Sequence, residues 1–239
     1  MKTEAKPNSC QEDHYKDKDR HLVAVDSIIF GFDKNQLKIL LIKRNFDPCK
    51  GKWSLMGGFL RKDESLDGAA QRVLYSLTGL KDVYLEQLYT YGDLNRDPGA
   101  RVISTAYYAL INIEKYEEQI SQEYNAQWWD INDHPELIFD HNMMVNKALR
   151  RLKRKTRTQP IGFELLPEKF TIPQLQALYE AIHQRKMDKR NFRKKILSYD
   201  FLERLEEKDK RNSKKGAFFY KFNEQKYREL VQKGYGFEI

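Results

Sequence analysis

The stretch GGFLRKDESLDGAAQRVLYSLTGL, residues 57–80, indicates a glycine-containing turn that leads into an amphipathic helix. Apolar side chains recur at spacings of three and four residues, which is typical of one buried helical face: Leu66, Ala70, Val73, Leu74 and Leu77. Gly79 then ends the run, as glycine commonly does at a helix C-terminus. The stretch therefore predicts a capped helix packed against a sheet.

The flanking sequence predicts the strands of that sheet. Runs of β-branched and aromatic residues, separated by turn residues, are typical of strands. We expect strands at 21–32, 37–44, 53–60, 82–93, 101–113 and 125–131, and a helix over 141–155. Residues 1–20 are polar and lack apolar periodicity, which predicts a flexible arm.

A second domain is predicted after residues 156–167, which carry two prolines and a glycine. We expect a helix over 171–184 with Thr171 as its N-cap and then a basic helix over 188–205 with Asp188 as its N-cap. The inward face of this basic helix is predicted to hold Phe192, Ile196, Leu197 and Leu202. A hairpin over 206–222 and a last helix over 223–234 complete the order of a winged helix-turn-helix. The predicted domains are a flexible arm, 1–20, an α/β domain, 21–156, and a winged helix, 157–239.

Charge divides the chain in the same way. Residues 1–145 hold 18 Lys and Arg against 23 Asp and Glu, whereas residues 146–239 hold 25 against 12. The first part is thus net −5 and the second net +13. A strongly basic domain favours a polyanionic partner, while the first domain is expected to do something else.

Other features exclude whole classes of protein. No apolar run approaches the length of a membrane span and the N-terminus lacks a signal-peptide core, so we expect a cytoplasmic protein without a membrane partner. Cys10 and Cys49 lack the spacing of a zinc site or a disulfide scaffold and are expected to be free thiols. We expect no metal and no cofactor.

The first domain resembles the Nudix superfamily. Residues 57–80 follow that superfamily's signature, in which a glycine turn precedes a helix whose acids, one turn apart, hold Mg²⁺ against a diphosphate. The framework matches at Gly58, Glu64, Arg72, Leu74, Gly79 and Leu80. The resemblance implies a Nudix-like α/β/α sandwich, so that the predicted fold class of the chain is α/β (α+β), with a winged helix-turn-helix following.

The three helix glutamates of the signature are missing. Val73, Ser76 and Leu77 stand in their places, and valine and leucine cannot ligate a cation. We therefore expect no catalytic residues and no hydrolase activity. A hydrolase that uses other acids, such as Glu64 and Asp67, is the alternative left open, although Glu64 also suits a helix cap or a partner of the helix dipole.

The basic helix has the character of a recognition helix. An α-helix fits the DNA major groove, where its N-terminal side chains reach base edges and its lysines and arginines neutralise phosphates. Arg190 and Asn191 are the candidates for base contacts. The remaining DNA-binding candidates lie along the helix, at the start of the preceding helix and at the hairpin tip: Lys189, Arg193, Lys194, Thr171, Lys210, Arg211 and Lys214. RNA is a less favoured partner, because the aromatic platform of an RNA-binding sheet is absent.

The two domains together resemble the Nudix-related transcriptional regulators. The phrases DVYLEQLYTYGDLNRDPGARVISTAYYAL and LLPEKFTIPQLQALYEAIHQRKMDKRNFRKKIL carry this resemblance. It implies a homodimeric repressor that binds double-stranded operator DNA and is released by a small molecule. Members of this family answer to ADP-ribose in control of NAD metabolism or, in one branch, to L-arabinose in control of sugar use. Because the box acids are lost and no replacement for a diphosphate grip is evident, we favour L-arabinose, with ADP-ribose as the alternative.

The effector is expected between the box, the strand ends and the loops that follow them. A sugar needs polar side chains for its hydroxyls and an aromatic face for its C–H surface. The candidates are Lys43, Trp53, Asp93, Asn95, Arg96, Tyr107 and Asp140. Plainer roles stay open: Trp53 and Tyr107 as core aromatics, Lys43 as a solvated charge and residues 93–99 as a turn. A scaffold in which both domains bind only protein is the remaining class.

Overall fold

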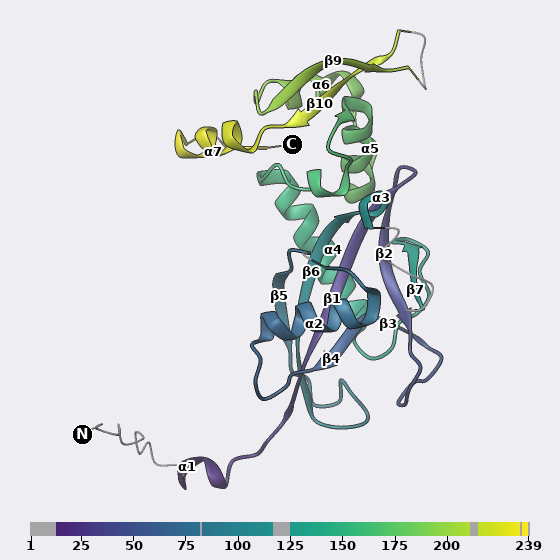
Figure 1. The fold of residues 1–239 in the computed structure, drawn as a ribbon, viewed down its shortest axis with the longest axis vertical. Helices are drawn as coiled ribbons and strands as arrows, with labels where there is room; N and C mark the ends of the chain where they lie inside the picture. Colours follow the sequence, from purple (N-terminus) through teal and green to yellow (C-terminus); the bar gives the residue numbers. More distant parts are fainter. Residues whose placement is uncertain (1–12, 82, 117–124, 211–214, 235, 239) are drawn as a thin grey trace, which may run out of the picture.

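The computed structural model describes residues 13–81, 83–116, 125–210, 215–234 and 236–238 (Figure 1). The molecule is elongated, with a large sheet and two flanking helices at one end and a small helical domain with a hairpin at the other. A single helical turn, α1 (Asp13–Lys16), lies in the part of the expected arm that is described. Among the described residues, no helix combines the length and the apolar composition that a membrane span requires.

The large sheet has seven strands and mixed topology. Its path runs β3-β2-β1-β6-β5, with β4 paired to β1 and β7 paired to β2. Strands β1 and β6 are parallel, and the other pairs are antiparallel. The strands are β1 (Leu22–Asp33), β2 (Gln36–Lys43), β3 (Trp53–Ser54), β4 (Met56–Phe59), β5 (Glu86–Tyr91), β6 (Val102–Asn112) and β7 (Ala126–Asp130).

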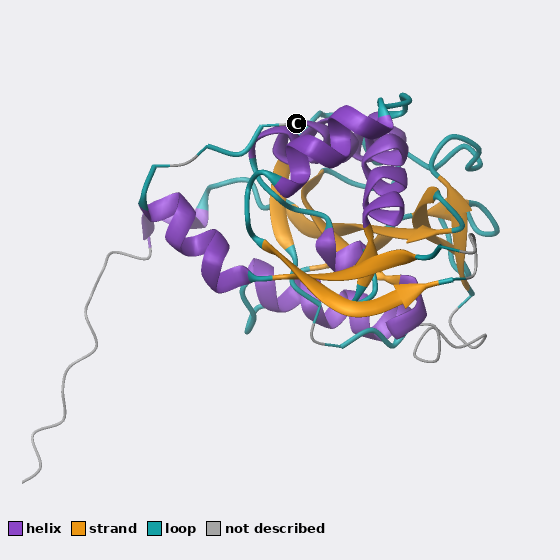
Figure 2. Ribbon diagram, turned by 90° about the horizontal axis from the view of Figure 1, so that it is seen from above, coloured by secondary structure: helices purple, strands orange, loops and turns teal. Residues whose placement is uncertain are grey.

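Two helices enclose the sheet and make the predicted α/β/α sandwich. Helix α2 (Leu66–Thr78) covers one face and α4 (His141–Thr158) the other, so that helices lie on both sides of the strands when the molecule is viewed along its long axis (Figure 2). Successive side chains of a strand point to opposite faces of the sheet. Ile28 therefore packs on the face covered by α4, whereas Ile29 packs on the face covered by α2. Because both faces are covered, β1 and β2 are apolar on both sides.

Helix α2 has the ends that the sequence predicts. The hydroxyl of Ser65 accepts a hydrogen bond from the Gly68 amide at 3.1 Å, and Gly79 takes a left-handed conformation, with φ 77°, at the C-terminal end. A short helix, α3 (Ile113–Tyr116), follows β6 and was not predicted.

The second domain is a winged helix. Its elements are the 3₁₀ turn η2 (Phe163–Leu165), β8 (Phe170–Thr171), α5 (Ile172–His183), α6 (Lys189–Leu197), β9 (Leu202–Asp209), β10 (Ala217–Phe222) and α7 (Glu224–Gln232). The order of helix, short link, basic helix, hairpin and helix is as predicted. The strand β8, which pairs with β10, was not.

The predicted length of the basic helix was wrong. Helix α6 ends at Leu197, and Leu202 opens β9 instead of continuing the helical face. The chain leaves the helix where the Ser198 amide donates to Lys194 and Lys195, and it turns at Asp200, whose φ of 55° is left-handed. Leu202 is nevertheless buried, because it points inward from the strand.

One buried cluster joins the two domains. Side chains of α4 pack both on the sheet and against Leu165, Leu175 and Leu178 of the second domain. Helix α4 continues past the predicted boundary at residue 156 to Thr158. At this end the hydroxyl of Thr156 donates to the carbonyl oxygen of Leu152 at 2.9 Å. The two domains therefore share a hydrophobic core and are joined through helix α4, not through a flexible linker.

Candidate functional site

A pocket of about 340 Å³ opens at the end of the sheet that lies away from the winged helix. Its size falls within the range of small-molecule sites. Five segments contribute most of its lining: the starts of β1 and α4, the loops after β2 and β5, and the glycine-containing strand β4. The polar and aromatic lining residues include Asp26, Arg44, Phe46, Asp47, Ser54, Phe59, Arg96, Asp97, Phe139 and His141.

A buried ion cluster forms the floor of this pocket. Arg96 donates from Nε to Asp140 Oδ2 at 2.9 Å and from a terminal nitrogen to Asp140 Oδ1 at 2.8 Å. The same terminal nitrogen lies 3.6 Å from Asp26 Oδ2, which also accepts a hydrogen bond from Ser104 at 2.5 Å. One arginine is thus shared by two carboxylates, and the cluster is satisfied by charge-assisted hydrogen bonds.

His141, in the first turn of α4, belongs to the same cluster as a neutral side chain. Its Nδ1 accepts a hydrogen bond from the Leu55 amide at 3.2 Å, which places the proton on Nε2, 3.5 Å from Asp26 Oδ1. Burial lowers the pKa of this imidazole and outweighs the opposite effect of Asp26. His141 therefore orients Asp26 without adding charge to the pocket.

Only two of the seven predicted effector residues, Arg96 and Asp140, come together at this pocket. Arg96 lines the pocket, and Asp140 holds Arg96. Lys43 and Trp53 face each other across β2 and β3, outside the lining, where Trp53 makes an edge-to-face contact with Trp129 at 5.2 Å between ring centroids. The other three also lie outside the lining: Asp93 and Asn95, exposed in the loop after β5, and Tyr107, buried under α2.

Tyr107 and Asp93 have structural partners. The Tyr107 hydroxyl donates to Asp67 Oδ1 at 2.6 Å and ties β6 to the first turn of α2. The carbonyl oxygen of Asp93 accepts from Arg101 at 2.9 Å, which closes the loop. These contacts agree with the core and turn roles that stayed open.

Sequence reasoning missed Asp26, Arg44, Phe46, Phe139 and His141. Asp26 carried a signal, because it interrupts the apolar run of residues 22–32 and a buried carboxylate must have a partner. The other four lie on loops or at the start of a helix, where the hydrophobic periodicity of the sequence does not indicate which way a side chain points.

The side chains of the box region are engaged in contacts within the first domain. Glu64 accepts from Arg72 Nε at 2.7 Å and from the Arg61 amide at 2.8 Å, and the hydrogen bond from Arg72 lowers the pKa of Glu64 to about 2. Val73 is buried against Gly58, and the Ser76 hydroxyl donates to the Val73 carbonyl at 3.0 Å. The residues at the acid positions do not fit a divalent metal ion. Among the described residues, no group of three or more His, Cys, Asp or Glu side chains is arranged so that it could hold a metal ion.

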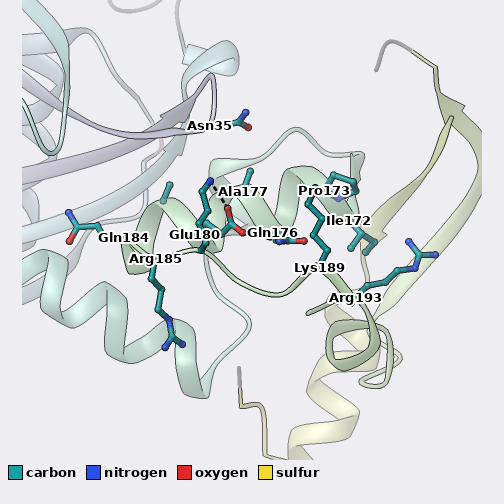
Figure 3. A pocket seen from close by; sticks show the side chains of 12 residues that line it. Asn35, Ile172, Pro173, Gln176, Ala177, Glu180, Gln184, Arg185, Lys189 and Arg193 are labelled. Atoms are coloured by element: carbon teal, nitrogen blue, oxygen red, sulfur yellow. Dashed lines mark hydrogen bonds and ion pairs between the residues drawn. The ribbon is translucent and has the colours of Figure 1, made fainter. Parts of the chain in front are cut away.

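The second candidate site lies on the winged helix. Helix α6 exposes the side chains predicted to face DNA: Lys189, Arg190, Asn191, Arg193 and Lys194. Together with α5 it borders a groove of about 690 Å³. Figure 3 shows Lys189 and Arg193 at the α6 side of this groove, and Asn35, from the β1–β2 turn, at the opposite end.

The link between α5 and α6 is held by Glu180. This carboxylate accepts from the Met187 amide, from Gln176 and from Lys186, at 3.0, 2.9 and 3.0 Å, and these hydrogen bonds lower the pKa of Glu180. Gln176 also donates to the Met187 carbonyl at 3.0 Å. These contacts tie the link, from which α6 starts, to the side of α5.

The remaining DNA candidates differ in position. Thr171 is buried and caps α5 in a reciprocal arrangement with Gln174. Lys210 is exposed where β9 ends. Arg211 and Lys214 lie outside the described residues.

Comparison with known proteins matches both domains. Residues 20–152 match the NUDIX domain, and residues 162–222 match the NrtR DNA-binding winged helix domain. The chain is similar to the ADPR responsive transcriptional repressor NtrR of Acinetobacter baylyi, with 36% identity over 210 residues that cover 86% of this chain and 84% of the relative.

Solved structures agree with this similarity. The structure of Shewanella oneidensis NrtR complexed with a 27mer DNA has a TM-score of 0.77 and 29% identity, and the match covers 90% of this chain and 97% of that one. The NUDIX domain of the same protein, complexed with ADP ribose, has a TM-score of 0.50 and 33% identity over 59% of this chain and 98% of that one.

Proposed function

Because the chain belongs to the NrtR family of regulators, which join a Nudix-related domain to a C-terminal winged helix, we propose that it is a transcriptional repressor that ADP-ribose releases from operator DNA. The observation that carries the proposal is the exposed basic N-terminal half of α6, which follows a link tied to α5, in the same chain as a pocket lined by charged and aromatic side chains. DNA binding in one relative and ADP-ribose binding in its NUDIX domain support the two halves of the proposal.

The comparisons support the ADP-ribose alternative and give no support to L-arabinose. The preference for arabinose rested on the missing box acids and on the lack of an evident replacement for them. The charged candidates drawn from the sequence, such as Lys43 and Arg96, did not include Arg44. The pocket draws on loops that sequence periodicity does not place, and Arg44 is among its lining residues.

We further propose that the protein is not a hydrolase. Val73 and Leu77 cannot ligate a metal ion, and Glu64 is engaged by Arg72 and the Arg61 amide. Incubation with ADP-ribose and Mg²⁺ should release no AMP above the rate without protein. Mg²⁺-dependent release of AMP would favour the hydrolase class instead.

Homodimerisation is part of the proposal, because operator recognition by helix-turn-helix proteins commonly uses two symmetric half-sites. Two copies of α6 would then meet half-sites about 34–36 Å apart, or at a multiple of that spacing. Effector release needs only a dimer arrangement with the wrong spacing or tilt that ADP-ribose binds more tightly. Shifting the population nearly completely requires a preference of about 5 kcal/mol.

Helix α4 offers a physical connection between pocket and DNA surface. Its first turn brings His141 to the pocket, and its last turn brings Thr156 Oγ1 to within 3.1 Å of His183 Nε2 on α5. An 18-residue helix spans about 27 Å. A small change at the ligand end can thus reach the helix-turn-helix through one rigid element.

The decisive experiment is a DNA-binding titration at fixed salt, with the DNA adjoining the protein's own gene and a scrambled duplex as control. ADP-ribose and L-arabinose are added separately to the complex. Release by ADP-ribose alone supports the proposal, whereas release by arabinose alone would return the protein to the sugar-responsive branch. Absence of salt-dependent DNA binding would favour the scaffold class.

A further inference from the structure

We propose that Arg44, seated against Phe46 and Phe139, is the anion-recognising side chain of the pocket and replaces the metal site that the box has lost. The inference rests on the proposed function, since it names the group that would hold the diphosphate of ADP-ribose. It also stands on the charges of the pocket itself, which limit where an anion can lie.

The pocket offers few positive charges. Among its described lining residues, the arginines are Arg44 and Arg96. Arg96 is buried and shared by Asp140 and Asp26, so its charge is already neutralised. The neutral His141 adds no charge. Arg44 is therefore the lining cation that no described carboxylate pairs with.

The Arg44 backbone is fixed at the base of a closed loop. Arg44 follows directly after β2, its amide donates to the Lys52 carbonyl at 2.9 Å, and its carbonyl accepts from the Gly51 amide at 2.8 Å. Its Nε donates to the Pro48 carbonyl at 3.0 Å. The side chain is thus anchored at its Nε, which reduces the conformational entropy lost when a ligand binds.

Two aromatic rings hold the guanidinium plane. The Arg44 carbon Cζ lies 4.0 Å from the ring centroid of Phe46 and 5.8 Å from that of Phe139. Contact with ring faces leaves the edge of the guanidinium, with its terminal N–H groups, available for hydrogen bonds. Such a fork matches two phosphate oxygens at once, and its weak hydration suits a site with aromatic walls.

The carboxylates of the pocket restrict the anion further. Asp26, Asp47 and Asp97 line it and would repel a diphosphate placed beside them. The anion therefore belongs at Arg44, and the hydroxyl groups of the ligand belong at the carboxylates, which accept hydrogen bonds. This division of the pocket into a cationic part and an acidic part also explains how a pocket rich in carboxylates can bind an anionic ligand.

The test compares full-length variants by calorimetric titration with ADP-ribose and with adenosine, which carries no phosphate. Arg44→Gln should weaken ADP-ribose binding about 30-fold to 100-fold and change adenosine binding by less than about twofold, because only the charge-assisted pair is removed. Arg44→Lys should recover only part of the loss, since lysine lacks the planar fork. Lys43→Gln removes the same charge from the neighbouring exposed residue, outside the lining, and should have little effect.

Phe46→Leu removes the aromatic ring that contacts the Arg44 guanidinium and leaves the charge of Arg44 in place. It should weaken ADP-ribose binding about twofold to fivefold, the size expected for one exposed cation–π contact. Equal losses of ADP-ribose and adenosine in Arg44→Gln would mean that Arg44 only shapes the pocket, and unchanged binding of ADP-ribose would also overturn the inference.

A wild-type protein that does not bind ADP-ribose would refute the proposed effector, and inorganic pyrophosphate and ADP then become the probes. Binding of either that Arg44→Gln abolishes would uphold the anion site without that effector. Failure of both to bind would overturn the inference as well.

Discussion

Arg96 and Asp140 form a two-pronged ion pair across the floor of the pocket, with Nε–Oδ2 and terminal nitrogen–Oδ1 distances of 2.9 and 2.8 Å. The pair joins the loop after β5 to the residue that precedes α4. Because Arg96 is buried and also faces Asp26, its removal leaves two carboxylates without compensation.

We predict that Arg96→Met lowers the free energy of unfolding by about 3 kcal/mol or more, the usual cost of breaking a buried pair from one side. Urea unfolding at pH 7 measures the change. Asp93→Asn, in the same loop but exposed, should change stability by less than about 0.5 kcal/mol. A loss below 1 kcal/mol in Arg96→Met would mean that water reaches the cluster and screens it.

Gly57 makes room for Asp26. A Cβ at Gly57 would lie 2.3 Å from Asp26 Oδ1, an atom that cannot swing away easily because Ser104 and Arg96 hold the other carboxylate oxygen. We therefore predict that Gly57→Ala costs about 1–3 kcal/mol of stability and weakens effector binding, as overpacking does in a rigid site. Gly92→Ala is the matched control, because nothing lies within 4 Å of its added Cβ. Equal melting temperatures of the two variants would contradict this account.

The fold was largely predictable from the sequence because its elements carry local signals. Periodicity placed α2 and the long strands, and capping residues placed the starts of α5 and α6. The failures were local: helix 188–205 was extended through a left-handed turn at Asp200, and the short β8 has no signal of its own, since it exists only by pairing with β10.

The candidate pocket was less predictable for a physical reason. Its charged groups meet across long sequence separations, as Asp26, Arg96 and Asp140 do, and no local pattern encodes such contacts. Composition suggested polar and aromatic residues in general, but whether an aromatic such as Trp53 faces a ligand or the core depends on strand register. The exposed basic surface of α6 was easier to predict, because its N-cap and its charge pattern lie on one short helix.

The exposed side chains of α6 predict two different responses to substitution. Replacing both Arg190 and Asn191 by Ala should abolish the preference for the operator over a scrambled duplex, because base-edge contacts carry sequence information. Lys194→Ala should weaken binding to both duplexes alike and lower the slope of log K against log salt by about 1. Anisotropy titrations at several salt concentrations measure both effects, with Lys233→Ala, exposed beyond α7, as the control. Unchanged operator preference in the double variant would remove α6 as the reading helix.

His183 makes the junction between the domains sensitive to acid. Burial, and then the nearby positive charges of Arg157, Arg185 and Lys153, lower its pKa from 6.5 to about 4. Because the Thr156 hydroxyl donates to Leu152, its oxygen accepts the Nε2 proton of a neutral His183. The folded chain thus holds the uncharged ring.

The sign of the pH effect follows from this shift. Above about pH 6.5 the His183 ring is neutral in both the folded and the unfolded chain, so the ring causes no loss of stability. Below about pH 6.5 the ring binds a proton in the unfolded chain but stays neutral in the folded chain until the pH approaches 4. Stability should therefore fall as the pH drops from 6.5 toward 4, by about 1 kcal/mol at pH 5.5 and about 3 kcal/mol over the whole range.

His183→Gln retains a polar side chain that does not titrate in this range and should lose less stability than the wild type between pH 7.5 and pH 5.5. Burial also lowers the pKa of His141, and this residue is present in both the wild type and the variant. Its contribution to the pH dependence therefore cancels when the urea midpoints of the two proteins are subtracted, and the difference reports on His183 alone. Parallel pH profiles for the two proteins would mean that the ring at residue 183 is solvated and that the α4–α5 junction is more open than the contact with Thr156 implies.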